Sequence, residues 1–246
     1  MQKQNPIEVY PVVHVMDVRQ AREQSTLALE LGADGIYLIS HGSMDADRLT
    51  EVFNRVSDDH EGAFIGINYL DLESGVTAYE YLDKAQKLGK INRLPNAIWA
   101  DNIEGFRGHD VNELLLRRGA NPDLQNVNFL GGIAFKYTGE YTDNPTEAAS
   151  DTKARGRYVD VITTSGPGTG KAPPVNKIAA MKAVAGDKPI AVASGIDVTN
   201  IEDYRGIVDK ILVASSVETK PYSGEFDPKK LADLIAVAHN KQLITT

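Results

Sequence analysis

Polar side chains that could take part in catalysis follow apolar runs at eight points along this chain. They are His14, His41, Asn68, Asp101, Lys136, Thr164, Ser194 and Ser215. A carboxylate and an amine in a partly dry site can have pKa values driven toward neutrality, which suits proton transfer. We therefore predict Asp101 and Lys136 as the acid–base pair, with Lys136 also able to neutralise an oxyanion. The alternative for this pair is an ion pair that only stiffens the site.

The two histidines at the ends of neighbouring apolar runs give a second prediction. His14 and His41 would orient the substrate beside the acid–base pair. Together with Asp101 they could also bind a metal through imidazole and carboxylate groups. The chain has no Cys and no compact spacing of metal ligands. The cofactor is therefore unknown, and a divalent metal is possible but is not the reading we favour.

Glycine- and serine-rich turns close the last three apolar runs. Such turns offer backbone N–H groups and hydroxyls, the chemistry that holds a phosphate. The predicted phosphate-binding residues are Ser194, Gly195, Ser215, Ser216, Thr164, Gly166, Gly168, Thr169 and Gly170.

The glycine-rich stretch after Thr164 matches neither common nucleotide-binding motif. A P-loop would need Gly where Ser165 stands and a hydroxyl residue where Ala172 stands. The spacing of Gly166, Gly168 and Gly170 differs from that of the dinucleotide fingerprint. Three glycines in five residues cost backbone entropy that a simple connector would avoid, so we predict a loop that closes over a ligand.

Strand-like and helix-like segments must position these residues, and they alternate along the whole chain. The apolar runs predict strands at 8–15, 35–40, 64–68, 97–102, 128–135, 159–164, 189–194 and 211–216. Helical patterns fall at 18–31, 45–56, 75–88, 110–118, 145–156, 174–185, 198–204 and 228–239. This alternation predicts an α/β fold of the (β/α)8 TIM-barrel class, with residues 1–246 as one domain. In such a barrel the loops after strands seven and eight commonly hold phosphate.

Composition limits the choice of partner. The chain has 246 residues, 26 Lys and Arg against 34 Asp and Glu, and a net charge of −8. This balance argues against a nucleic-acid partner. No apolar run approaches about 18 residues and no secretory leader is evident, so we expect a cytoplasmic protein without a membrane partner. A homo-oligomer is possible, since most soluble oligomers are symmetric assemblies of one chain.

Four segments resemble the BtpA family, whose barrels are similar to the ribulose-phosphate-binding barrels. They span residues 99–110, 131–136, 160–170 and 193–200, within a likeness that is clearest from 97 to 217. The resemblance implies a TIM barrel with a phosphate grip at the last two strands. It also places Lys136 on the family's strand-five lysine and residues 166–170 on its Gly/Thr loop. The family has been linked to photosystem I biogenesis, and other members are described only as enzymes of unknown reaction.

Two functions follow as hypotheses. The first is an enzyme that binds a small phosphorylated metabolite, such as a sugar phosphate or a phosphoribosyl or nucleotide-type compound. Isomerisation, lyase chemistry and glycosyl transfer all fit this reading. The alternative is a non-enzymatic assembly or regulatory factor that uses the barrel as a ligand- or partner-binding module, because a fold alone does not fix function.

Overall fold

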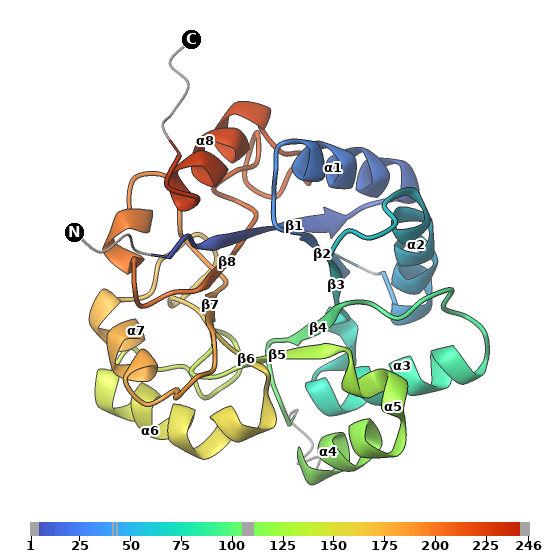
Figure 1. Ribbon diagram of the computed structural model, residues 1–246, viewed down its shortest axis with the longest axis horizontal. Coiled ribbons are helices and arrows are strands. Elements are labelled where there is room, and N and C mark those ends of the chain that lie inside the picture. Colours follow the sequence, from blue (N-terminus) through green and yellow to red (C-terminus); the bar gives the residue numbers. More distant parts are fainter. Residues whose placement is uncertain (1–4, 41, 43, 105–110, 242–246) are drawn as a thin grey trace.

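Eight parallel strands close into a barrel in chain order, so the predicted fold class is confirmed (Figure 1). This computed structural model describes residues 5–40, 42, 44–104 and 111–241. The strands are β1 (Glu8–Val15), β2 (Ile36–Ser40), β3 (Ile65–Asn68), β4 (Ala97–Ala100), β5 (Asn128–Gly132), β6 (Val161–Thr164), β7 (Ile190–Val192) and β8 (Lys210–Val213). Strand β1 pairs with both β2 and β8, which leaves no free sheet edge.

Helices surround the barrel on its outer side (Figure 1). They are α1 (Val18–Glu30), α2 (Ala46–Asp59), α3 (Gly75–Lys87), α4 (Val111–Ala120), α5 (Pro122–Gln125), α6 (Pro145–Arg155), α7 (Val175–Lys182) and α8 (Pro228–Ala238). Short 3-10 helices stand at η1 (Leu70–Leu72), η2 (Gly156–Tyr158) and η3 (Ile201–Tyr204). Most helices begin at a side-chain cap. At α8, for example, Asp227 accepts from the backbone of Lys229 and Lys230, and Pro228 follows as the first helical residue.

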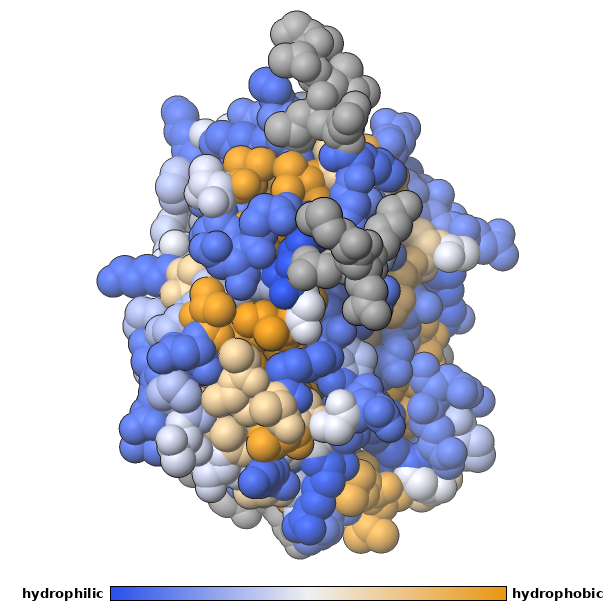
Figure 2. Space-filling view, turned by 60° about the vertical axis from the view of Figure 1, so that its left-hand side comes forward, coloured by the Kyte–Doolittle hydropathy of each residue, from blue (hydrophilic) through white to orange (hydrophobic). Residues whose placement is uncertain are grey.

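The surface is largely hydrophilic, which agrees with apolar residues that pack toward the interior. Figure 2 brings forward the left-hand side of Figure 1, where α6 and α7 lie. Hydrophilic residues cover most of that face, and hydrophobic residues gather only in separate patches. Within the described residues, every helix is too short or too polar to cross a lipid bilayer.

The predicted helix at 198–204 is wrong in type, because only the 3-10 turn η3 forms there. The side chains around it explain the difference. Asp197 accepts from the backbone N–H of Thr199, and Asn200 accepts from that of Asp197. Such local side-chain contacts compete with helical hydrogen bonds. The short helix α5 was not predicted.

Several predicted strands also extend too far. The ladders end at Ala100 in β4, Gly132 in β5, Val192 in β7 and Val213 in β8. After β5 the chain turns sharply, since Ala134 has a left-handed φ of 48°. The polar residues predicted at these strand ends therefore lie just past the ladders, on the loops that form the barrel mouth.

Aromatic rings fill the inside of the barrel. Tyr37 lies edge-on to Tyr10 and Trp99, at centroid distances of 5.8 and 6.1 Å, and near Phe64 at 6.0 Å. A Cβ on Gly66 of the neighbouring strand would lie 2.1 Å from the Tyr37 ring. The missing side chain at Gly66 therefore makes the room that Tyr37 occupies.

Gly66→Ala should destabilise the protein by about 1–3 kcal/mol, because a methyl group cannot enter a filled core without displacing the Tyr37 ring. Gly119→Ala is the matched control, since Gly119 lies in α4 with open space around its Cα. That change should stabilise the protein by about 0.5–1 kcal/mol through helix propensity. Urea unfolding measures both, and equal stability of the two variants would contradict this packing.

Candidate ligand site at the barrel mouth

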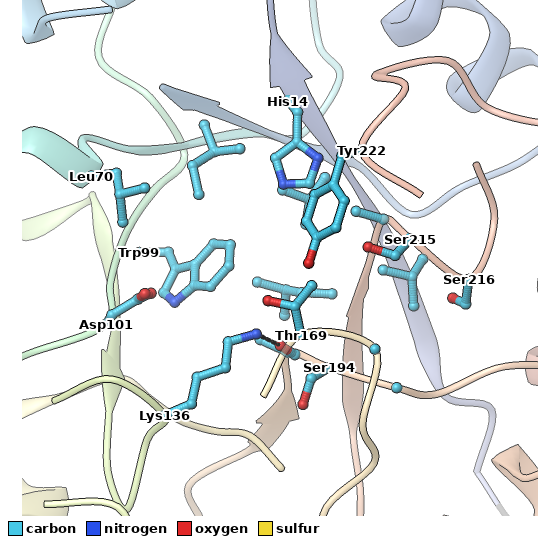
Figure 3. A pocket seen from close by; sticks show the side chains of 18 of the residues that line it. His14, Leu70, Trp99, Asp101, Lys136, Thr169, Ser194, Ser215, Ser216 and Tyr222 are labelled. Atoms are coloured by element: carbon cyan, nitrogen blue, oxygen red, sulfur yellow. Dashed lines mark hydrogen bonds between the residues drawn. The ribbon is translucent and has the colours of Figure 1, made fainter. Parts of the chain in front are cut away.

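A cavity of about 240 Å³ opens at the carboxyl ends of the strands. Its walls come from β1, from the ends of β4, β7 and β8, and from the loops after β5 and β6 (Figure 3). The structure brings these predicted residues together along it: His14, Asp101, Lys136, Thr169, Gly170, Ser194, Gly195, Ser215 and Ser216.

Three predicted phosphate-binding residues do not line this cavity. Thr164 is buried on the side of β6 away from the barrel axis, and its hydroxyl donates to the Ala134 carbonyl at 3.4 Å. Gly166 and Gly168 shape the loop after β6 instead of facing the cavity. A Cβ on Gly166 would lie 2.1 Å from the Lys171 carbonyl oxygen. His41 lies outside the described residues.

The ends of β7 and β8 present polar groups without protein partners. Gly195 has a φ of +65°, and a Cβ there would lie 2.1 Å from the Ala172 nitrogen, so the loop after β6 packs directly on this turn. Within the described part of the chain, the backbone N–H groups of Gly195, Ser215 and Ser216 donate to no other residue. The buried hydroxyl of Ser215 also has no partner there. Grouped N–H donors of this kind can hold an anion.

Neighbouring hydroxyls fix the shape of this turn. Ser194 accepts from the Gly166 N–H at 2.8 Å, which joins the end of β7 to the loop after β6. Ser216 donates to the Ile196 carbonyl at 2.9 Å. The β7 and β8 turns are therefore held in one arrangement before any ligand binds.

Asp101 lies directly past β4, where the neighbouring strand β5 approaches closely. A Cβ on Gly132 would lie 1.8 Å from the Asp101 carbonyl oxygen, so only glycine fits there. The carboxylate accepts from the side-chain amide of Asn68 at 3.3 Å. Burial raises the pKa of Asp101 to about 6, while the charge of Lys136 and the Asn68 hydrogen bond act in the opposite direction.

Lys136 reaches the cavity from the loop after β5. Its Nζ donates to the Ala193 carbonyl at 3.2 Å and does not pair with Asp101, so the two groups do not form the stiffening ion pair named above as the alternative (Figure 3). Burial lowers the pKa of Lys136, and the charge of Asp101 opposes that shift. Burial therefore moves the pKa of each group in the direction that favours proton transfer.

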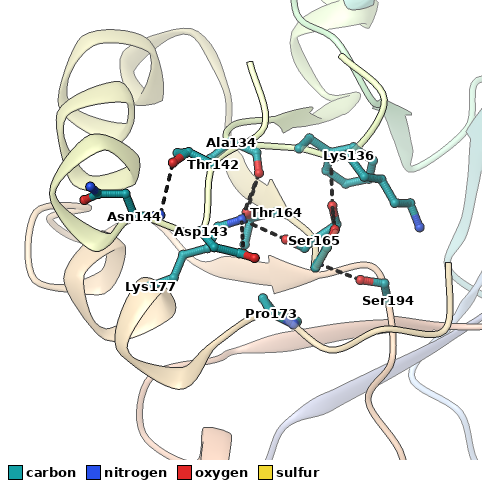
Figure 4. Close-up of polar contacts among 12 residues, drawn as sticks. Ala134, Lys136, Thr142, Asp143, Asn144, Thr164, Ser165, Pro173, Lys177 and Ser194 are labelled. Atoms are coloured by element: carbon teal, nitrogen blue, oxygen red, sulfur yellow. Dashed lines mark hydrogen bonds and ion pairs between the residues drawn. The ribbon is translucent and has the colours of Figure 1, made fainter. Parts of the chain in front are cut away.

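A second lysine, Lys177 of α7, supports this loop from behind (Figure 4). Its side chain is fully buried, and Nζ donates to the carbonyls of Ala134 at 2.9 Å and Ser165 at 2.8 Å. Ser165 in turn accepts from the Lys136 N–H at 2.8 Å. Asp143 lies 3.8 Å from Nζ, and burial lowers the pKa of Lys177 to about 8. Lys177 thus joins the loops after β5 and β6. No pattern in the sequence singles out Lys177, because a lysine is rarely buried.

Glu218 was also missed. It is fully buried behind the cavity, and its carboxylate lies 3.2 Å from Nδ1 of His14. The other carboxylate oxygen accepts from the backbone N–H of Tyr222 at 2.7 Å. Glu218 therefore fixes the ring of His14 at the cavity edge. The feature of the sequence that could have identified Glu218 is its position soon after Ser215, in a loop that returns toward β1.

Two tyrosines at the cavity rim have an unusual backbone. Tyr137 and Tyr222 both line the cavity, with left-handed φ values of 65° and 62°. Such values are costly for residues with a bulky side chain and concentrate at functional sites. The strain sits beside the groups described above and is consistent with a ligand-binding mouth.

A metal centre gains no support from the described residues. Among them, no three His, Asp or Glu side chains lie close enough to hold a metal ion. The predicted trio includes His41, which the structure does not describe, so that prediction stays untested.

Comparisons with known proteins give the fold. No protein-family model matches this chain, and no curated protein matches it. Similar solved structures include phosphoribosyl anthranilate isomerase from Thermus thermophilus, with a TM-score of 0.61, 15% identity and coverage of 94% of this chain and 97% of that one. A 2-keto-3-deoxy-6-phospho-gluconate aldolase from Zymomonas mobilis has a TM-score of 0.62, 15% identity and coverage of 98% and 96%. Tryptophan synthase from Mycobacterium tuberculosis has a TM-score of 0.65, 12% identity and coverage of 96% and 93%.

Asp101→Asn should stabilise the protein near neutral pH. The pKa of about 6 in the folded state exceeds the ordinary 3.8. Between these values the folded state binds more protons than the unfolded state, so the free energy of unfolding falls as the pH rises through that window. Above it, the ionised carboxylate costs about 1–3 kcal/mol, which the amide avoids.

Urea unfolding of both proteins at about pH 4 and near neutral pH measures this effect. The advantage of the variant should be present near neutrality and nearly absent at about pH 4. The exposed Asp187 supplies the control Asp187→Asn, which should change stability by less than about 0.5 kcal/mol at either pH. A variant less stable than the parent near neutral pH would contradict the assignment.

Lys177→Met should destabilise the protein by about 2–3 kcal/mol, because it leaves two buried carbonyls without a donor. Lys229→Met is the control, since the Lys229 side chain is 76% exposed and pairs with Asp233 on the surface. That change should cost less than about 0.5 kcal/mol. Urea unfolding compares the two, and an equal effect would show that the buried contacts of Lys177 add nothing.

Proposed function

We propose that this protein is an enzyme that acts on a small phosphorylated metabolite bound at the barrel mouth. The observation that carries this proposal is one cavity lined by two chemically different sets of groups. The N–H groups of Gly195, Ser215 and Ser216, which have no partner among the described residues, form one set, and Asp101 and Lys136, with shifted pKa values, form the other. The first suits a phosphate, and the second suits proton transfer.

The chemistry follows from how each group is held. The β7 and β8 turns would bind the phosphate and so fix the rest of the substrate beside the acid–base pair. Asp101 would remove a proton as its carboxylate, and Lys136 would return one or stabilise a developing oxyanion. His14, oriented by Glu218, would position the substrate. Isomerisation, lyase chemistry and glycosyl transfer all use such steps, and a Schiff base on Lys136 is a further route.

The solved structures that resemble this chain support the proposal, because the names of some of them describe phosphorylated substrates. Two of them are described as acting on a phosphoribosyl compound and on a phosphorylated keto acid. They share this fold at low sequence identity, so they supply an analogy of architecture. Membership of the BtpA family, a cytoplasmic location and a homo-oligomeric state remain predictions from the sequence.

A thermal-shift titration with inorganic phosphate, glycerol 3-phosphate and ribose 5-phosphate tests the phosphate site. A ligand at about 100 times its dissociation constant should stabilise the protein by about 2.7 kcal/mol. Ser215→Asp should remove that shift, because a carboxylate would stand where the phosphate binds. Ser150→Asp adds the same charge on the exposed face of α6 and should leave the shift intact.

The acid–base role is tested in the same preparations. Lys136→Ala and Asp101→Asn should keep phosphate binding within about threefold yet lose turnover of any substrate that the panel identifies by about 100-fold or more. Absence of a shift with every phosphate would overturn the proposed function. Turnover that survives both substitutions would overturn the catalytic roles and favour the ligand-binding alternative.

A further inference from the structure

We propose that the ligand of this cavity carries a flat apolar group, an aromatic ring, beside its phosphate. This rests on the proposed function in one respect, namely that the phosphate binds at the ends of β7 and β8. The inference adds the chemical class of the rest of the ligand. We expect the cavity to bind an aryl phosphate in preference to a sugar phosphate, which has many hydroxyls.

Apolar side chains form much of the wall away from the β7 and β8 turns, where Asp101 also lies (Figure 3). Leu70 and Trp99 lie on the opposite side of the cavity from Ser215 and Ser216 (Figure 3). Val12 of β1 and Ile39 of β2 add further apolar side chains to the lining. Against these apolar side chains a sugar hydroxyl would lose water and gain no hydrogen bond from them, which opposes binding. Asp101 and Lys136 are left to contact the reacting group of the ligand.

The indole of Trp99 forms a rigid part of this wall. Its ring lies edge-on to Tyr37 at 6.1 Å and to Phe135 at 6.3 Å, and only 6% of the residue is exposed. Its Nε1–H is buried and has no partner among the described residues. Because the indole is already packed in place, a ligand ring could contact it without an ordering cost.

Leu70 forms the rim of the same wall. It is 49% exposed, although its backbone is held by a hydrogen bond from its N–H to the Ser40 hydroxyl at 3.0 Å. A fixed leucine that lines a cavity and is half open to solvent can be covered by an apolar part of the ligand. Its side chain supplies contact area that a sugar would not use.

The size of the cavity agrees with this class of ligand. At about 240 Å³ it exceeds the roughly 150 Å³ of an apolar cavity known to hold benzene, which leaves room for a phosphate beside one ring.

The chain contains one tryptophan, Trp99, so its fluorescence reports directly on this cavity. We would titrate the protein with phenyl phosphate, methyl phosphate and ribose 5-phosphate and follow Trp99 emission, with calorimetry as a second readout. Phenyl phosphate should bind about 30-fold more tightly than methyl phosphate, since the two differ by the burial of a ring. It should also bind more tightly than ribose 5-phosphate.

Leu70→Asn should weaken binding of phenyl phosphate about tenfold and leave methyl phosphate unchanged. Leu116→Asn is the matched control, because Leu116 is 72% exposed on α4 and lies outside the cavity lining. It should affect neither ligand. Ser215→Asp should weaken both ligands alike.

The outcomes separate this inference from the proposed function. Binding of methyl phosphate and ribose 5-phosphate with no gain for phenyl phosphate would overturn the aromatic half and leave the phosphate site standing. Equal effects of Leu70→Asn on the phenyl and methyl compounds would do the same. Failure of all three phosphates to bind would overturn both proposals.

Discussion

In a closed parallel barrel, the inward-facing side chains meet a ligand at the mouth. Aromatic packing below the mouth limits how deeply that ligand can bind. Tyr37, seated in the space left by Gly66, packs against Trp99 and closes the barrel interior. Side chains alternate along a strand, and Asp101 takes the next inward-facing position after Trp99, just past the end of β4. The carboxylate therefore stands on an apolar floor, and this burial is what raises its pKa. The floor and the chemistry of the cavity depend on the same packing.

Each member of the acid–base pair is held by hydrogen bonds to other residues, and the two side chains do not form an ion pair. Lys136 is placed by Ser165 and by the Ala193 carbonyl, and Lys177 stabilises Ser165 from behind. A direct ion pair would keep both groups charged and move their pKa values away from neutrality. Because each group is held by its own hydrogen bonds, burial shifts the pKa of each one. Burial of these two groups lowers the stability of the protein, as is expected where the needs of a functional site oppose favourable packing.

The sequence predicted the barrel and most of the mouth because those features are local. A β-branched run followed by a polar residue identifies a strand and its end. This was enough to predict that Asp101, Lys136 and Ser215 lie at the same end of the barrel. It could not show where a ladder stops, as at Gly132, or that Thr164 faces outward, because both depend on the neighbouring strands. Glu218 and Lys177 were missed for a related reason. Glu218 acts on a histidine 204 positions away in the chain, and Lys177 gains its role only from being buried.

The net charge of −8 opposes an anionic ligand at long range, yet the geometry of the mouth makes the local balance of charge different. Backbone N–H groups at Gly195 and Ser215 carry fixed partial positive charges whatever the sum of the side chains, and Lys136 faces the same cavity. Surface charges act through water and are screened within about 10 Å, whereas groups that line a cavity contact the ligand directly. A phosphate at this turn would therefore experience the local donors more than the global field. The same contrast explains why a largely apolar wall can lie opposite a phosphate site: each end of the ligand is selected by the few groups it touches.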